Sequence, residues 1–166
     1  MSRNWPQKRG RDLPMSKNWP DERGFGLAEL IVVVAMIGVL MALAMPSFLS
    51  YWRSSLISAG ASELASVLSR GRALAIAQNT NVCVQVSGTS VRFRTVSCAG
   101  TIWTGSGTDG SGLITLSNGV QVSGATSAIF TNAGGASPGA TYTVTDPKSS
   151  RTRSVVVSAT GRVTVQ

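Results

Sequence analysis

The sequence predicts an α+β fold, in which a long N-terminal helix packs on a head made of antiparallel β-sheet. Two observations predict it. Apolar residues recur at helical spacing in the first half of the chain, whereas after residue 80 short β-branched runs alternate with Gly, Ser, Asn and Pro. We expect four segments: a basic N-terminal stretch at 1–24, a transmembrane helix at 25–48, an amphipathic stalk helix at 49–79 and a β head at 80–166.

The helix begins in an apolar stretch that is long enough to span a membrane. Residues 25–48 read FGLAELIVVVAMIGVLMALAMPSF, and a bilayer core about 30 Å thick needs about 20 such residues. Residues 1–24 before it carry six Lys or Arg against three Asp or Glu. The positive-inside bias therefore places the N-terminus in the cytoplasm and the chain beyond Phe48 on the other side of the membrane.

Glu29 is the one charged residue in this apolar stretch. An ionised group in such surroundings is costly and marks a functional site by default. Two simpler interpretations compete with a functional role. A secretory signal peptide could end at the small residues Ala42 and Ala44, although its apolar core would usually be only about 7 to 15 residues long. Alternatively, the segment is a plain membrane anchor whose glutamate has no role.

Gly24 and Phe25 followed by Glu29 resemble the prepilin motif of type IV pilins. The resemblance implies that residues 1–24 are a leader, which a membrane-bound prepilin peptidase removes by cutting after Gly24, and that the new amino terminus at Phe25 is methylated. It also implies that Glu29 pairs with the terminal amine of a neighbouring subunit and so sets the register between subunits. Breaking a buried pair of this kind by removing one partner costs on the order of 3–5 kcal/mol.

Gly38 and Pro46 fall where pilins commonly carry residues that loosen the helix. Proline removes a backbone donor and clashes with the preceding turn, and glycine weakens a helix by about 1 kcal/mol relative to alanine. We therefore expect local bending or melting of the helix at these two positions.

The leader contains an internal repeat. Residues 1–10 (MSRNWPQKRG) and 15–24 (MSKNWPDERG) match at seven of ten positions. Only the second copy is followed by Phe and by a glutamate at the right spacing, so we expect cleavage at Gly24 alone. Met15 is an alternative start, which would leave a leader of ten residues.

The helical pattern continues beyond the apolar stretch. Apolar residues recur at spacings of three and four or their sums, at Leu49, Trp52, Leu56, Leu64, Val67, Leu68, Gly71, Leu74 and Ala75. We expect one helix from about Phe25 to Gln78, whose second half packs beneath the head. Asn79 then ends it, because Asn tolerates the left-handed conformation that is common after a helix.

The head is expected to be one globular domain with the helix packed against a single antiparallel sheet. Its candidate strands are 82–87, 90–97, 113–116, 120–123, 128–131, 141–145, 153–158 and 162–165.

The head resembles the GspH/FimT family of minor pilins and pseudopilins. The residues that carry this resemblance are RGRALAIAQN at 70–79, Cys83, Cys98 and Trp103, IFTNAG at 129–134 and VVVSATGRV at 155–163. The resemblance implies a structural subunit that assembles with other pilins or pseudopilins.

Cys83 and Cys98 are the two cysteines of the chain. Because the predicted topology places them outside the reducing cytosol, we expect a disulfide. A turn at Gly88 would set residue 83 against residue 94, so a bulge or a bend after Thr95 is needed to bring Cys98 back. Two buried free thiols are the alternative. No metal is expected, since zinc usually takes four ligands and the chain has no histidine.

The charge pattern indicates a possible partner other than pilin subunits. Beyond the membrane segment we count nine Lys or Arg against three acids, and Lys148, Arg151, Arg153 and Arg162 fall near the C-terminal hairpin. A basic face attracts phosphate backbones, such as those of double-stranded DNA. Some FimT-like minor pilins bind DNA through a Gly-Arg-x-Arg pattern, but here Thr164 follows Gly161-Arg162-Val163 in place of the second arginine. Solvated charges that keep the head soluble are the alternative.

Catalysis is not expected. After the leader the chain has no histidine and only four acidic residues, which are scattered along it, and no cofactor is expected.

From these observations together we expect a minor pilin or pseudopilin of the bacterial inner membrane, with its head in the periplasm and later at the cell surface. It would join a filament of a type IV pilus or of a type II secretion system at the tip or at initiation. Pro46-Ser47-Phe48 favours the pilus. The alternative is a DNA-binding minor pilin that acts in natural transformation.

Overall fold

The computed structural model describes residues 26–125 and 127–166. The chain divides after Ala42 into two compact units, and the second unit comprises Leu43–Gln166. Helix α1 (Leu27–Ala77) contributes to both units. The predicted single helix is therefore confirmed over the described residues, and it runs without interruption through Gly38 and Pro46.

Helix α1 ends at Ala77, and Asn79 terminates it in the conformation that the sequence predicts. Asn79 has a φ of 50°, which is the left-handed conformation. The Thr80 N–H donates to the Ala75 carbonyl at 3.1 Å and the Asn79 N–H to the Ile76 carbonyl at 3.2 Å, and this pair of bonds defines a Schellman motif. The motif satisfies carbonyls that the end of the helix would otherwise leave unpaired, and it turns the chain directly into the first strand.

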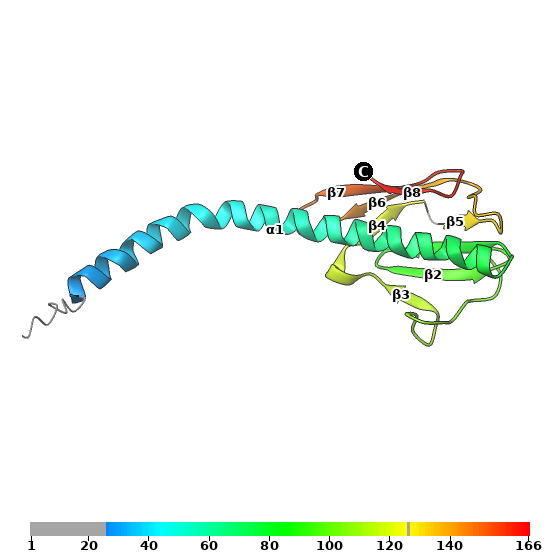
Figure 1. The fold of residues 1–166 in the computed structure, drawn as a ribbon, viewed down its shortest axis with the longest axis horizontal. Helices are drawn as coiled ribbons and strands as arrows, with labels where there is room; N and C mark the ends of the chain where they lie inside the picture. Colours follow the sequence, from blue (N-terminus) through cyan, green and yellow to red (C-terminus); the bar gives the residue numbers. More distant parts are fainter. Residues whose placement is uncertain (1–25, 126) are drawn as a thin grey trace, which may run out of the picture. The chain divides into compact units, whose positions relative to one another are not determined.

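All eight predicted strands are present, but they form two sheets where the sequence predicted one (Figure 1). The first sheet has the order β3-β2-β1-β5, with bounds Leu113–Thr115, Ser90–Thr95, Val82–Ser87 and Ser127–Phe130. The second has the order β4-β6-β7-β8, with bounds Gln121–Gly124, Ala140–Thr145, Thr152–Val157 and Val163–Val165. A short 3₁₀ helix, η1 (Ser117–Gly119), precedes β4. All strand pairs are antiparallel.

The single-sheet prediction is wrong because neighbouring strands of the sequence pair with distant ones. Strand β5 follows β4 along the chain, yet β5 pairs with β1 and β4 pairs with β6. Gly124, at a φ of 103°, lies at the end of β4 where the chain leaves the second sheet. The alternation of apolar and polar side chains indicates which face of a strand is buried, but it does not indicate which strand lies beside it.

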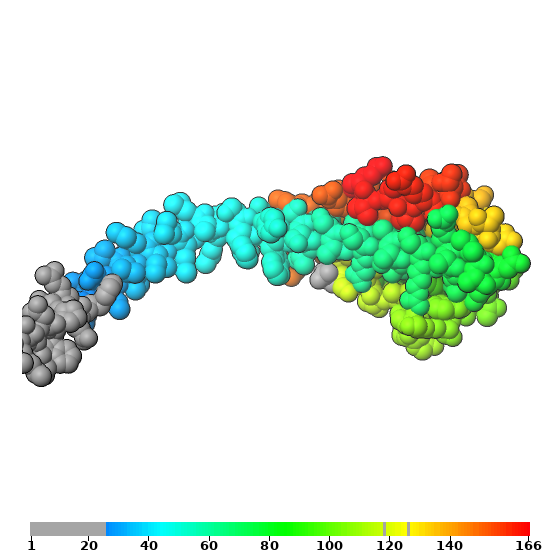
Figure 2. Space-filling view, in the orientation of Figure 1, coloured from blue at the N-terminus to red at the C-terminus, as the bar shows by residue number. Residues whose placement is uncertain are grey.

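The C-terminal half of α1 lies across both sheets and closes one core with them (Figures 1 and 2). The predicted helix face is confirmed at Leu64, Val67, Leu68, Gly71 and Ala75, which are buried. It is wrong at Leu49 and Trp52, which are exposed. The face also includes Ile57, Gly60 and Ala61, because the buried part of the helix begins only at Ile57. Its largest fully buried partners are Tyr142, Phe93 and Phe130.

Candidate functional site

The N-terminal part of α1 presents a continuous apolar surface. Fifteen large apolar side chains are exposed on it, namely Leu27, Leu30, Ile31, Val32, Val33, Val34, Met36, Ile37, Val39, Leu40, Met41, Leu43, Met45, Phe48 and Leu49. By length and composition α1 can cross a membrane, and it is the one such helix among the described residues. Because water does not solvate apolar surface of this extent favourably, it needs a bilayer or other apolar helices as its surroundings.

Glu29 lies at the head of this surface, in the first turn of α1. Its side chain is exposed, so its carboxylate is open to a partner outside the chain. A carboxylate in the first helical turn also interacts favourably with the helix dipole, which is a local role that does not require a partner. Gly24 and Phe25, the predicted cleavage and methylation positions, lie outside the described residues.

Gly38 and Pro46 occupy open positions in α1. A methyl group at Gly38 would meet no neighbouring atom within 4 Å, so packing does not require a glycine there. Pro46 has no N–H to offer the carbonyl of Ala42, and the boundary between the two compact units follows Ala42. The expected bending or melting at these residues remains a prediction.

A disulfide joins Cys83 to Cys98, with the sulfur atoms 1.97 Å apart. The predicted register is confirmed, since Cys83 lies opposite Arg94. The predicted bend follows Thr95: Val96 has a φ of 72°, and the Gly100 N–H donates to the Ser97 carbonyl at 2.9 Å. This bend returns Cys98 to strand β1.

Two side chains fasten the loop that the disulfide closes. The Gln85 amide donates to the Cys98 carbonyl at 3.0 Å. Arg94 donates from Nε to Gln85 Oε1 at 2.9 Å and from Nη1 to the Gly100 carbonyl at 2.8 Å. Arg94 is therefore engaged inside the head, and its charge is not free to serve as part of a basic binding surface.

The structure separates the four basic residues that the sequence placed together. Lys148 and Arg151 lie in the loop between β6 and β7, and Arg153 is the second residue of β7. Arg162 lies beyond the other end of β7, in the turn that leads to β8. Six residues of strand span roughly 20 Å, so Arg162 stands apart from the other three.

A fourth basic residue, which sequence reasoning missed, joins these three. Arg53 of α1 lines the same surface hollow as Lys148 and Arg151. The Arg151 guanidinium donates to the Ser50 carbonyl of α1 at 3.4 Å. These residues are about a hundred positions apart, and no local pattern in the sequence marks their approach.

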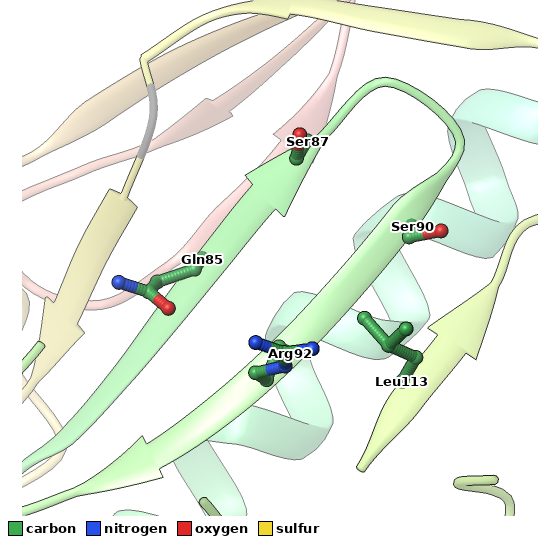
Figure 3. Close-up of a pocket in the computed structure, with 5 residues that line it drawn as sticks. All are labelled: Gln85, Ser87, Ser90, Arg92 and Leu113. Atoms are coloured by element: carbon green, nitrogen blue, oxygen red, sulfur yellow. The ribbon is translucent and has the colours of Figure 1, made fainter. Parts of the chain in front are cut away.

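A small polar pocket lies on the outer face of the first sheet (Figure 3). Gln85 and Ser87 of β1 line it together with Ser90 and Arg92 of β2 and with Leu113 of β3. Gln85 and Arg92 lie directly opposite each other in the strand register. The Arg92 Nε is buried and has no hydrogen-bond partner among the described residues. This chemistry suits a small anionic group, and sequence reasoning had not identified the pocket.

Comparisons with known proteins identify the N-terminal motif and the fold. The family model for the prokaryotic N-terminal methylation motif matches residues 19–45. The type IV minor pilin FimU of Pseudomonas aeruginosa is similar in structure, with a TM-score of 0.55 and 17% identity over 70% of this chain and 92% of that chain. The minor pseudopilin EpsH of the Vibrio cholerae type II secretion system has a TM-score of 0.51 and 13% identity over 66% of this chain and 95% of that chain. No curated protein sequence matches the chain.

The motif match contains Gly24, Phe25 and Glu29, the residues on which the resemblance to type IV pilins rests. The structural matches cover the helix and head arrangement that the sequence predicted. The chain therefore carries the N-terminal methylation motif of type IV pilins on a type IV pilin-like fold.

Proposed function

We propose that the chain is a minor pilin or pseudopilin, a structural subunit of a type IV pilus or type II secretion filament that enters at the tip or at initiation. Prepilin peptidase would remove residues 1–24 at the inner membrane, leaving the head in the periplasm. The observation that carries this proposal is Glu29, exposed in the first turn of a helix whose apolar side chains are also exposed. The head, by contrast, buries its own core.

This division of the chain suits a subunit that moves from a membrane into a filament. The exposed apolar surface of α1 is compatible with lipid and with the helices of other subunits. In both surroundings the Glu29 carboxylate needs a cationic partner, since an unpaired buried charge is strongly destabilising. The terminal amine at Phe25 of a neighbouring subunit supplies that charge, so the pair would fix the axial position of each subunit.

The replacement Glu29→Val tests this role. The variant should still insert into the membrane, because valine suits the bilayer at least as well as glutamate. Its incorporation into sheared filaments should fall at least about 100-fold, as expected when breaking a buried ion pair costs on the order of 3–5 kcal/mol. The control is Ala28→Val, which changes the adjacent exposed position and keeps the carboxylate. Normal incorporation of Glu29→Val would remove the assigned role.

Mass spectrometry of the membrane-extracted protein tests the processing. The expected product begins at a methylated Phe25. A protein that begins at residue 1, at Met15 or at Met45 would contradict the proposed cleavage, and a product that begins at residue 11 would show that the first copy of the leader repeat is the substrate.

The competing proposal is a DNA-binding minor pilin that acts in DNA uptake. Its support is the excess of basic residues on the head, including Arg162, which is exposed. Because Arg162 stands apart from Lys148, Arg151 and Arg153, a replacement at Arg162 tests the contribution of its region to DNA binding without altering the other region. Electrophoretic mobility of double-stranded DNA with the purified protein should show a salt-sensitive shift that Arg162→Ala abolishes. The absence of such a shift would exclude this function.

A further inference from the structure

Four basic side chains gather at the end of the head where the chain leaves its apolar stretch. They are Arg53 of α1, Lys148 and Arg151 of the β6–β7 loop and Arg153 of β7, and we name them the basic collar. All four are exposed. Figure 2 shows the β6–β7 loop, in orange, beside the cyan part of α1, and the bond from Arg151 to the Ser50 carbonyl holds the two together.

The collar surrounds two adjoining hollows that combine apolar and basic walls. One has a volume of about 510 Å³, and Pro46, Leu49, Arg53, Lys148 and Arg151 are among the residues that line it. The other is lined by Ile57 together with Arg151 and Arg153, so Arg151 belongs to both. A ligand that fits such a surface carries an anionic group next to an apolar portion.

The collar keeps a net positive charge after the carboxylate of Asp146 is counted. Asp146 lies in the same loop, and its carboxylate accepts bonds from the Ser149 hydroxyl and from the Lys148 N–H, the latter at 3.0 Å. Four cations against one carboxylate leave a net charge of +3. Asp146 also interacts electrostatically with Arg53 and Lys148, so it offsets one of the four positive charges and leaves the other three.

Arg53 lies along the helix at the height of the headgroup layer of a bilayer. Arg53 follows Phe48, the last residue of the apolar stretch, by five positions, or about 7.5 Å of helix. The headgroup layer extends roughly 5–8 Å beyond the hydrocarbon on each side. Tyr51 and Trp52, which are 74% and 55% exposed, lie at the same level, where aromatic residues gather in membrane proteins.

We propose that the basic collar binds the phosphate groups of anionic phospholipids at the surface of the membrane that anchors α1. This inference rests on the proposed membrane-anchored function. Binding would hold the head against the bilayer before assembly, with lipid phosphate among the four cations and the glycerol and upper acyl chain against Pro46 and Leu49. Entry into a filament would then require release of these lipids.

The test uses the full chain reconstituted in phosphatidylcholine membranes with trace spin-labelled lipids. Electron paramagnetic resonance gives the motionally restricted fraction of spin-labelled phosphatidylglycerol and, separately, of phosphatidylcholine. The wild type should prefer phosphatidylglycerol, and added salt should weaken the preference. The double replacement Lys148→Gln and Arg153→Gln should reduce it by up to about fivefold for each residue. The control, Arg92→Gln with Arg162→Gln, removes the same charge elsewhere and should keep the preference.

The absence of a preference for phosphatidylglycerol in the wild type would overturn the proposal, and so would an equal loss of the preference in the control variant. A DNA mobility shift that the Lys148 and Arg153 replacements abolish, without any lipid preference, would also overturn it and assign the collar to DNA.

Glu29→Val should keep the lipid preference, because Glu29 is not part of the collar. The lipid measurement can therefore fail while filament incorporation succeeds, and the reverse also holds. Near-ultraviolet circular dichroism confirms that each variant is folded, and Arg53→Gln provides an independent collar variant.

Discussion

Gly71 of helix α1 faces Val84 of strand β1 so closely that a methyl group at Gly71 would lie 2.5 Å from Val84 Cγ2. The same methyl group would lie 3.4 Å from Phe93 and 3.8 Å from Phe130, two of the largest buried side chains. The glycine therefore allows the helix to approach the first sheet, and this contact lies within the buried core.

Gly71→Ala should lower the free energy of unfolding of the head. Overpacking a core costs about 1–3 kcal/mol, whereas the gain in helix propensity is at most about 1 kcal/mol, so we expect a net loss of about 1–2 kcal/mol. Thermal unfolding of the full chain in detergent, followed by near-ultraviolet circular dichroism, measures it. The control is Ser69→Ala at an exposed position of the same helix. Unchanged stability of Gly71→Ala would contradict the tight contact.

The disulfide should contribute about 3 kcal/mol, the value expected when a cross-link closes a loop of about 15 residues. The double replacement Cys83→Ala and Cys98→Ala should lose this amount in urea unfolding under oxidising conditions. Reduced wild-type protein is the control, because it loses the cross-link and keeps both side chains. Peptide mapping without reductant should recover Cys83 and Cys98 in one linked fragment, and recovery of two free thiols would refute the prediction.

Tyr142→Phe should leave stability unchanged or raise it by about 1–3 kcal/mol. The Tyr142 hydroxyl is buried and has no hydrogen-bond partner among the described residues, and an unsatisfied buried donor costs free energy of this size. The same burial raises the pKa of Tyr142 to about 12, so its phenolate should be missing from an ultraviolet titration at about pH 10. Tyr51→Phe, at an exposed position, is the control. A large loss of stability in Tyr142→Phe would reveal a partner for the hydroxyl.

Asp146 should stabilise the head at neutral pH and cease to do so in acid. The Ser149 hydroxyl and then the Lys148 N–H bind its carboxylate, which lowers the pKa of Asp146 from 3.8. A lowered pKa means that the folded state binds fewer protons than the unfolded state, so this contribution is present above pH 3.8 and is lost as the pH falls through the folded-state pKa.

Comparison of melting temperatures checks this pH dependence. The wild type should melt above Asp146→Asn at neutral pH, and the two melting temperatures should converge once the pH has fallen below the folded-state pKa of Asp146. Ser149→Ala removes the largest cause of the pKa shift. The difference in melting temperature between Ser149→Ala and Asp146→Asn should therefore change less with pH than the difference between the wild type and Asp146→Asn. A difference that persists unchanged in acid would assign the effect of Asp146 to something other than its charge.

Much of the fold was predictable because its patterns are local. Helical spacing and the Asn79 terminator predicted α1 to within one residue of its C-terminal end, and β-branched runs between turn residues located all eight strands. The methylation motif was equally local, since Gly24, Phe25 and Glu29 lie within six residues. The turn at Gly88 predicted which residues of β1 and β2 pair, and therefore that Cys98 must return past a bend.

The division into two sheets was not predictable, because backbone hydrogen bonds between strands are the same whichever strands make them. Packing of both sheets against one helix face decides that β5 pairs with β1 while β4 pairs with β6. The same packing brings the β6–β7 loop to Ser50 and Arg53, and it leaves Arg162 at the far end of β7. The sequence by itself determined the helix, the strands and the motif, whose causes lie within a few residues. Only the tertiary structure decided which charges share a surface, because that depends on contacts between segments about a hundred residues apart.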